Sequence, residues 1–151
     1  MGAAMLPNFL VIGAMKSGTT SFAHYLGSHP QVFMTKDKEP AFFNRPDSFD
    51  GGLEWYSSLF AGAGGALARG EASTDYAKYP RFRGVPEWIA AAVPEMRLLY
   101  LVRHPIERCA AAGIEKQRRE RGWARIGHDG GPFGGFVKQG GATAPRAYDR
   151  D

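Results

Sequence analysis

The chain has 151 residues, of which 44% are hydrophobic and 13% aromatic, so it can form one globular domain and is not a disordered chain. Its net charge of +4 at pH 7 suits an anionic small molecule as well as a nucleic acid, and the charge does not separate the two. A single cysteine excludes an internal disulfide, and no apolar run approaches the ~20 residues that cross a bilayer. Since the first residues carry no signal-peptide pattern, we expect a cytoplasmic protein with no membrane partner.

The first half of the chain alternates apolar runs with helical spacing. Residues 9–12 (FLVI) are continuously apolar, which predicts a strand buried on both faces of a parallel sheet. Residues 19–26 have helical spacing, and residues 31–34 predict a second strand. The order strand, glycine-containing loop, helix, strand is a β-α-β unit and indicates an α/β fold.

The second half continues this alternation up to residue 121. Residues 97–102 (RLLYLV) are the second strongly apolar run and predict a central strand of the sheet. Helices are predicted over 53–60, 86–93 and 105–121, the last two with proline near the first turn. Another strand is expected to end near residues 70–73.

The segment 13–20 (GAMKSGTT) follows the first predicted strand and opens the first predicted helix. In that geometry several backbone N–H groups and the positive end of the helix dipole point at one place, so the expected occupant is an anion. The residues predicted to cradle it are Lys16, Ser17, Gly18, Thr19 and Thr20. An ordinary Gly/Ser turn between a strand and a helix is the alternative.

The spacing of this segment approaches the nucleotide-binding pattern G-x-x-x-x-G-K-[ST], with one difference. Thr19 stands where a nucleotide hydrolase carries lysine, and the lysine comes three residues earlier, at Lys16. Hydrolysis of ATP or GTP is therefore disfavoured, and no residue pattern indicates a magnesium site or another metal.

A candidate base follows the second predicted strand, in the segment 38–43 (KEPAFF). Transfer of a group to a hydroxyl needs a base, and partial desolvation by aromatic neighbours favours proton uptake by a carboxylate such as Glu39. Ligands of parallel α/β sheets bind at the strand ends, where this segment is predicted to lie. From the residues alone, a solvated turn is the alternative.

Arg103 follows the apolar run 97–102 and precedes a helix that Pro105 opens. An arginine at a strand end can hold a phosphate through two parallel hydrogen bonds. The alternative for Arg103 is a surface ion pair.

Three of these segments together resemble one family, the sulfotransferases that use 3'-phosphoadenosine-5'-phosphosulfate (PAPS). Residues 7–21 (PNFLVIGAMKSGTTS) are similar to the family's 5'-phosphosulfate-binding loop, and residues 38–43 to its Lys-Glu-Pro-x-Phe-Phe segment. Residues 99–108 (LYLVRHPIER) are similar to its 3'-phosphate segment. The most similar type is the bacterial relatives of the heparan sulfate sulfotransferases.

The resemblance implies a P-loop NTPase-like α/β three-layer sandwich with a central parallel sheet. It implies sulfuryl transfer from PAPS to a hydroxyl or amine of a small-molecule or carbohydrate acceptor, without a metal and without nucleic acid. Lys16 would contact the 5'-phosphosulfate and assist departure of the leaving phosphate, Glu39 would be the catalytic base, and Arg103 would hold the 3'-phosphate. Lys38 would help to position the donor or acceptor.

A further segment, residues 70–76 (GEASTDY), resembles one that lines the acceptor side in the family. Glu71 and Tyr76 are therefore weaker site candidates, with purely structural roles as the alternative. Thr74 stands where many relatives have proline.

The resemblance covers about residues 7–110 and then fades. Ala111 stands where the family pairs its phosphate-binding arginine with a serine, and glycines cluster at 130–131, 134–135 and 140–141. We expect residues 1–121 to form a donor-binding domain that is incomplete at its C-terminus, and residues 122–151 to be a disordered tail. The alternative function is a truncated, catalytically impaired family fragment that at most binds adenosine 3',5'-bisphosphate-type ligands.

Overall fold

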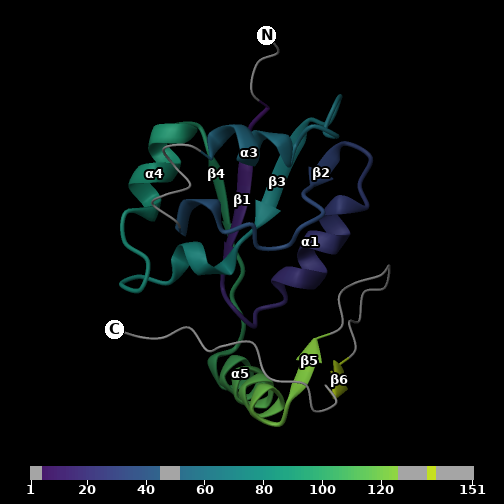
Figure 1. Ribbon diagram of the computed structural model, residues 1–151, viewed down its shortest axis with the longest axis vertical. Helices are drawn as coiled ribbons and strands as arrows, with labels where there is room; N and C mark the ends of the chain where they lie inside the picture. The colour runs from purple at the N-terminus through teal and green to yellow at the C-terminus, as the bar shows by residue number, and fades with distance from the viewer. Residues whose placement is uncertain (1–4, 45–51, 126–135, 139–151) are drawn as a thin grey trace. The chain divides into compact units, whose positions relative to one another are not determined.

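In the computed structural model (Figure 1) the structure describes residues 5–44, 52–125 and 136–138. The chain divides into two compact units, Met1–Arg108 and Cys109–Asp151. In chain order its helices and strands are β1 Phe9–Gly13, α1 Thr19–Gly27, β2 Val32–Met34, the 3-10 helix η1 Phe42–Asn44, α3 Leu53–Ser58, β3 Ala68–Ala72, the 3-10 helix η2 Thr74–Ala77, α4 Val85–Ala92, β4 Arg97–Tyr100, α5 Pro105–Glu120, β5 Trp123–Arg125 and β6 Phe136–Lys138.

The first unit is built on a four-stranded sheet with the order β2-β3-β1-β4. All three strand pairs are parallel, and Leu10 of β1 lies opposite Glu71 of β3 and Leu98 of β4. The carboxyl ends of the strands therefore meet at one edge of the sheet, the lower edge in Figure 1. The loops that follow the four strands all leave the sheet at that edge, which is where parallel sheets bind ligands.

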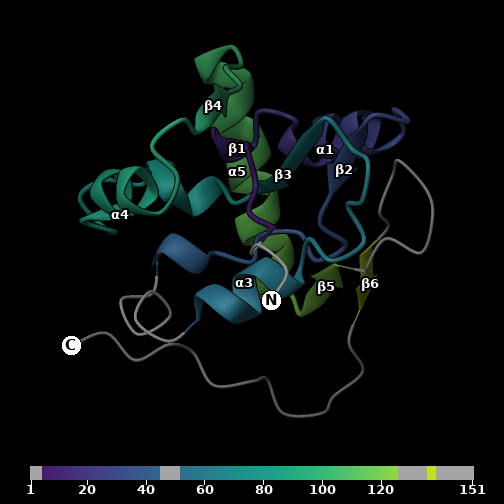
Figure 2. The ribbon, with the colours of Figure 1, turned by 90° about the horizontal axis from the view of Figure 1, so that it is seen from above.

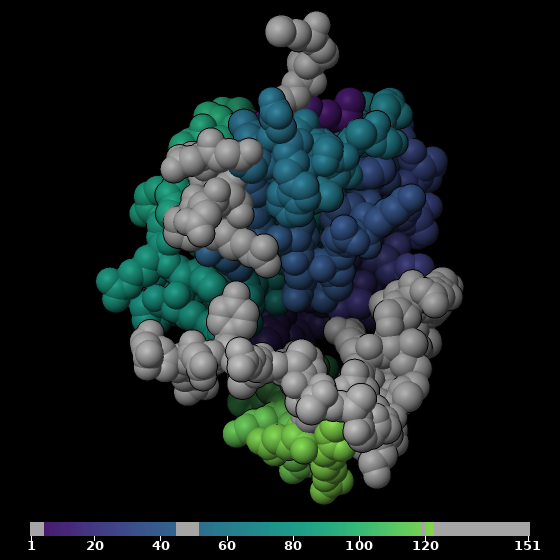
Figure 3. All heavy atoms as spheres, in the orientation of Figure 1, coloured from purple at the N-terminus to yellow at the C-terminus, as the bar shows by residue number. Residues whose placement is uncertain are grey.

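Both faces of the sheet are covered at its strand β1, as the side-chain alternation along β1 requires. Leu10 and Ile12 pack with residues of α3 and α4, whereas Phe9 and Val11 pack with residues of α1. Figure 2 shows α1 on one side of the sheet and α3 and α4 on the other. The space-filling view shows the residues of α3 and of the segment before β3 lying over the first of these faces (Figure 3). The predicted three-layer α/β sandwich with a parallel sheet is confirmed.

An aromatic cluster fills the layer between the sheet and α3. It consists of Phe42 and Phe43 of η1, Tyr56 of α3 and Phe60, all fully buried. The rings of Phe42 and Tyr56 are stacked, with centroids 4.3 Å apart, and Phe43 lies edge-on to Phe42 at 5.0 Å. Such contacts stabilise a core beyond the burial of area alone. This cluster anchors the end of the segment 38–43, so the preceding loop that carries Glu39 is attached to the core.

The prediction of a central strand over residues 97–102 is wrong for the described sheet. Among the described strands β4 pairs only with β1, so it is an outermost strand of the sheet. The side chains of Leu98 and Tyr100 are 51% and 53% exposed. Apolarity of a strand predicts that it will be covered, but it does not say which part of a chain covers it.

The prediction of coil beyond residue 121 is corrected at six residues. β5 and β6 pair antiparallel, with Ala124 opposite Val137. Gly122, with a φ of 72°, provides a left-handed turn after α5. The other residues of the predicted tail lie outside the described part of the chain.

Gly70 marks the closest approach of β3 to β1. A Cβ atom built on Gly70 would lie 2.3 Å from ring atoms of Phe9, whose side chain is buried against α1. We expect Gly70→Ala to lower the free energy of unfolding by about 1–3 kcal/mol, because the ring must leave a packed position. Urea denaturation measures this, with Gly64→Ala as the control, since a Cβ there meets nothing within 4 Å. Equal losses in both variants would contradict the explanation.

Candidate active site

The loop between β1 and α1 turns back on itself through two left-handed residues, Lys16 with a φ of 67° and Gly18 with a φ of 86°. The N–H group of Ser17 donates to the carbonyl oxygen of Ala14 at 3.0 Å and closes the turn. Gly18 is the N-cap of α1 and supplies no side-chain cap, and the first turn of α1 holds no acidic residue. The N–H groups that open α1 are thus available to an anion.

Ser17 provides an independent sign that this loop is built for a polar ligand. Its Oγ atom is buried and has no hydrogen-bond partner among the residues that the structure describes. Leaving a buried hydroxyl unsatisfied costs about 1–3 kcal/mol, a cost that a bound oxyanion would remove. The chemistry of the loop, with main-chain amides, a hydroxyl and the ammonium group of Lys16, fits the 5'-phosphosulfate end of PAPS.

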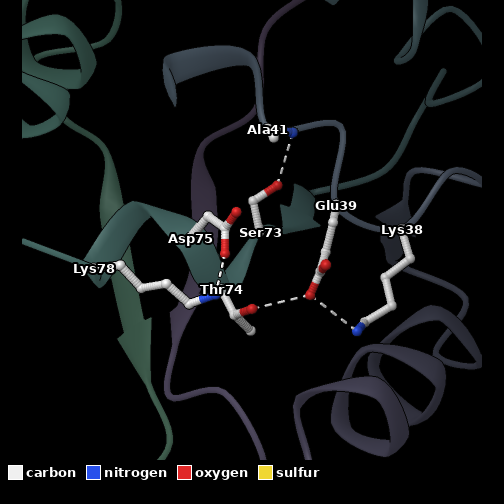
Figure 4. A network of polar contacts seen from close by, with 7 residues as sticks. All are labelled: Lys38, Glu39, Ala41, Ser73, Thr74, Asp75 and Lys78. Carbon is white, nitrogen blue, oxygen red and sulfur yellow. Dashed lines mark hydrogen bonds and ion pairs between the residues drawn. The ribbon is translucent and has the colours of Figure 1, made fainter. Parts of the chain in front are cut away.

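Glu39 lies in the loop after β2, with its backbone in the left-handed region at a φ of 63°. Its N–H group donates to the carbonyl oxygen of Ala72 at 3.1 Å. Its Oε1 atom accepts hydrogen bonds from Thr74 Oγ1 at 3.0 Å and from Lys38 Nζ at 3.2 Å (Figure 4). The Glu39 side chain is 43% exposed, so the carboxylate is held by protein donors and is still accessible to a substrate.

The residues after β3 hold the rest of this loop in place. Ser73 Oγ accepts a hydrogen bond from the Ala41 N–H group at 3.0 Å, and the Tyr76 hydroxyl accepts one from the Phe43 N–H group at 3.4 Å (Figure 4 shows the first). A left-handed conformation at a residue other than glycine costs of order 1–3 kcal/mol and persists only when its surroundings enforce it. These bonds, together with the aromatic cluster, supply that enforcement at Glu39.

Glu71 is a second carboxyl group nearby, and it is fully buried. Burial raises the pKa of Glu71 to about 7, against the opposing effect of the hydroxyls of Tyr76, Ser73 and Tyr56, and the charge of Glu39 raises it further. The Tyr56 hydroxyl donates to Glu71 Oε1 at 3.3 Å, whereas Oε2 has no hydrogen-bond partner within the described part of the chain. Burial also raises the pKa of both tyrosines, so they remain neutral donors. Of the two alternatives for Glu71 and Tyr76, their burial favours the structural one.

Arg103 lies three residues beyond the end of β4, and its side chain is 42% exposed. Its Nε atom pairs with Glu107 Oε2 at 3.1 Å, in the first turn of α5. No contact with the described residues is recorded for its two terminal nitrogens, which are the pair that a phosphate would use. The ion pair considered from the sequence is therefore present, and the phosphate contact stays a prediction. Ala111 lies in α5 and offers no hydroxyl.

The sheet brings the predicted site residues to one edge. The N–H group of Ala14 donates to the carbonyl oxygen of Leu101 at 2.9 Å, which joins the loop after β1 to the segment after β4. The bond from Glu39 to Ala72 joins the loop after β2 to the end of β3. The anion loop, the candidate base and the strand-end arginine thus share the carboxyl edge, as the sequence predicted for a parallel sheet.

The sequence did not reveal which groups hold the candidate base. Thr74 was noted only for standing where many relatives have proline, Ser73 only as part of the segment 70–76, and Tyr56 carried no signal. The contact of Thr74 with Glu39 spans 35 residues and depends on the pairing of β2 with β3. The contact of Thr74 with Glu39 could have been predicted from one feature of the sequence, a hydroxyl residue that follows a predicted strand next to the one that precedes the candidate base.

Among residues 5–44, 52–125 and 136–138, no group of three or more His, Cys, Asp or Glu side chains is arranged to hold a metal ion. Over the same residues, none of the helices has the length and apolarity required to traverse a bilayer.

A parallel α/β sandwich with an anion-binding loop between its first strand and first helix defines the class of P-loop-like folds. No family model matches the chain. Curated relatives do match it, and the ones described below are sulfotransferases by name. Membrane-associated sulfotransferase kil1 of Dictyostelium discoideum is 36% identical over 106 residues, which are 68% of this chain and 21% of the relative.

Two human proteins give similar matches. Heparan sulfate glucosamine 3-O-sulfotransferase 3B1 is 33% identical over 110 residues, covering 71% of this chain and 26% of the relative. Bifunctional heparan sulfate N-deacetylase/N-sulfotransferase 2 is 31% identical over 113 residues, covering 68% and 12%. The chain spans about a quarter or less of the length of these relatives.

A solved structure that matches this chain is also a sulfotransferase. The sulfotransferase from Alicyclobacillus acidocaldarius matches with a TM-score of 0.67 at 32% identity, over 76% of this chain and 51% of that chain. The chain belongs to the sulfotransferase family.

Proposed function

We propose that this chain binds PAPS at the carboxyl edge of its sheet and takes part in sulfuryl transfer to a hydroxyl or amine. The observation that carries the proposal is the loop between β1 and α1, with its uncapped helix start and the buried, unpartnered Ser17 hydroxyl. PAPS supplies the sulfuryl group. The acceptor oxygen or nitrogen forms a bond to sulfur while the bond from sulfur to the 5'-phosphate oxygen breaks.

Each predicted residue has one task in this scheme. Lys16 and the amides at the start of α1 stabilise the negative charge that grows on the 5'-phosphate as it leaves. Glu39 takes the proton that the acceptor loses, so positive charge does not build up on the acceptor oxygen or nitrogen as its bond to sulfur forms. Arg103 holds the 3'-phosphate through its terminal nitrogens.

For the acceptor we propose a carbohydrate. Two of the relatives carry heparan sulfate in their names, and the exposed carboxylate of Glu39 stands at an open edge that a saccharide hydroxyl or amine can reach. Desulfated heparan sulfate is therefore the acceptor to test first.

A second candidate function is donor binding without turnover. It is favoured by Ala111, which lacks the serine hydroxyl expected beside the 3'-phosphate, and by the pairing of Arg103 with Glu107. A lost hydrogen bond to a charged phosphate costs on the order of 1.5–3 kcal/mol, or about tenfold or more in affinity.

Calorimetric titration of 3'-phosphoadenosine-5'-phosphate and of ATP tests the donor site. We expect the former to bind in preference to ATP and Lys16→Ala to weaken it by about 10- to 100-fold, because one charge-assisted contact is lost. Arg97→Ala is the matched control, since Arg97 is the first residue of β4 and lies at the amino-terminal end of the parallel strands, away from the donor loop. Equal affinity for ATP, or equal loss in both variants, would argue against the proposal.

Transfer of labelled sulfate from PAPS to desulfated heparan sulfate then separates the two functions. Transfer by the wild-type chain supports the enzyme. Binding of the donor product without transfer to any hydroxyl or amine acceptor supports the binding function.

A further inference from the structure

We infer that Thr74 is a positioning residue for Glu39: its hydroxyl fixes the carboxylate so that Oε2 is the oxygen presented to the acceptor. This inference rests on the proposed role of Glu39 as the base. Its basis is the polar network that Figure 4 shows between the loop after β2 and the first residue of η2.

Both donors to the Glu39 carboxylate contact the same oxygen. Thr74 Oγ1 lies 3.0 Å from Oε1, and Lys38 Nζ lies 3.2 Å from it. Within the described part of the chain, no contact is recorded for Oε2. Two donors reduce the ability of Oε1 to accept a further proton, so the proton of an acceptor goes to Oε2.

The two donors differ in rigidity, and this difference singles out Thr74. The side chain of Lys38 is flexible and 31% exposed, and an exposed ion pair of this kind contributes little. Thr74 is 5% exposed, and its β-branched side chain has few rotamers. Thr74 therefore defines the position of Oε1, and the flexible side chain of Lys38 adjusts to that position.

The segment that carries Thr74 is itself fixed. Ser73 on one side accepts the Ala41 N–H bond, and Asp75 on the other side pairs with Lys78 (Figure 4). Thr74 thus connects a rigid strand end to a half-exposed carboxylate. Removing its hydroxyl would leave the Glu39 backbone in place and free only the side chain, so the expected effect is on orientation of the base.

The test uses Thr74→Val, which removes the hydroxyl and keeps the shape, and Thr74→Ser, which keeps the hydroxyl. With labelled PAPS and desulfated heparan sulfate, we expect Thr74→Val to lower kcat by about tenfold, with KM for PAPS unchanged and with activity restored in Thr74→Ser. Thr35→Val is the control, because its hydroxyl bonds to the Asp37 carbonyl oxygen and not to Glu39.

A second readout does not depend on turnover. Carbon-13 relaxation of the Glu39 side chain should report faster motion in Thr74→Val than in the wild type, Thr74→Ser and Thr35→Val. If Thr74→Val does not fold, Thr74→Ala takes its place.

The outcomes for the two proposals are distinguishable. An active wild type with unchanged kcat and unchanged Glu39 mobility in Thr74→Val would overturn the positioning role alone. A wild type that transfers no sulfate contradicts the enzyme function, and the relaxation measurement then decides the role of Thr74 by itself.

Discussion

Glu39→Gln is expected to reduce sulfate transfer by about 10²- to 10⁴-fold, the range that general bases contribute. The substitution is nearly isosteric and keeps an oxygen that accepts the hydrogen bonds from Thr74 and Lys38. It removes the negative charge, and the amide that replaces Oε2 cannot take the acceptor's proton. The loss should therefore appear in kcat.

Binding of 3'-phosphoadenosine-5'-phosphate by Glu39→Gln should stay at the wild-type level, since the amides and Lys16 of the donor loop are untouched. Glu95→Gln makes the same chemical change on an exposed carboxylate after α4 and is the matched control. A Glu39→Gln variant that transfers sulfate at the wild-type rate would show that another group accepts the proton.

The second large effect concerns stability and pH, and it comes from Glu71. Its pKa is about 7 in the folded chain and near 4.5 when exposed, because burial disfavours the charged form. Between these two values the folded chain keeps a proton that the unfolded chain has released. Stability therefore falls as the pH rises from about 4.5 to about 7, by about 3 kcal/mol in total from this group, and the contribution is constant above that range.

Glu71→Gln should remove this dependence. A neutral amide resembles the protonated carboxyl, and its oxygen can accept the hydrogen bond from the Tyr56 hydroxyl. We expect the variant to be more stable than the wild type at pH 8, with a smaller difference at pH 5. Urea denaturation of both proteins at several pH values measures this, and the difference between the two curves cancels the titration of other groups. Parallel curves would contradict the assignment to Glu71.

The stability effect also bears on the activity assays. Since Glu71→Gln removes the loss of stability between pH values of about 4.5 and about 7, it serves as a stabilised background in which the other variants are assayed.

The sequence by itself determined what depends on neighbours along the chain. The apolar run 9–12, the glycine-containing loop and the following helical spacing predicted β1, the anion loop and α1, because strand burial and loop turning are encoded locally. An α/β fold with a parallel sheet followed from the order of such elements, and the three-layer sandwich followed from the resemblance to the sulfotransferases. Residues Lys16, Glu39 and Arg103 were placed at strand ends by the same reasoning.

The tertiary structure decided what depends on strand order and on contacts between distant segments. The apolar sequence of β4 is compatible with an outermost strand and with a central strand. The pairing order β2-β3-β1-β4 shows that β4 is an outermost strand of the described sheet. The buried state of Glu71 and the bond from Thr74 to Glu39 arise because β3 brings residues 71–76 against loops from elsewhere in the chain. Desolvation and hydrogen bonding depend on distance in space, and a sequence specifies that distance only once the chain has folded.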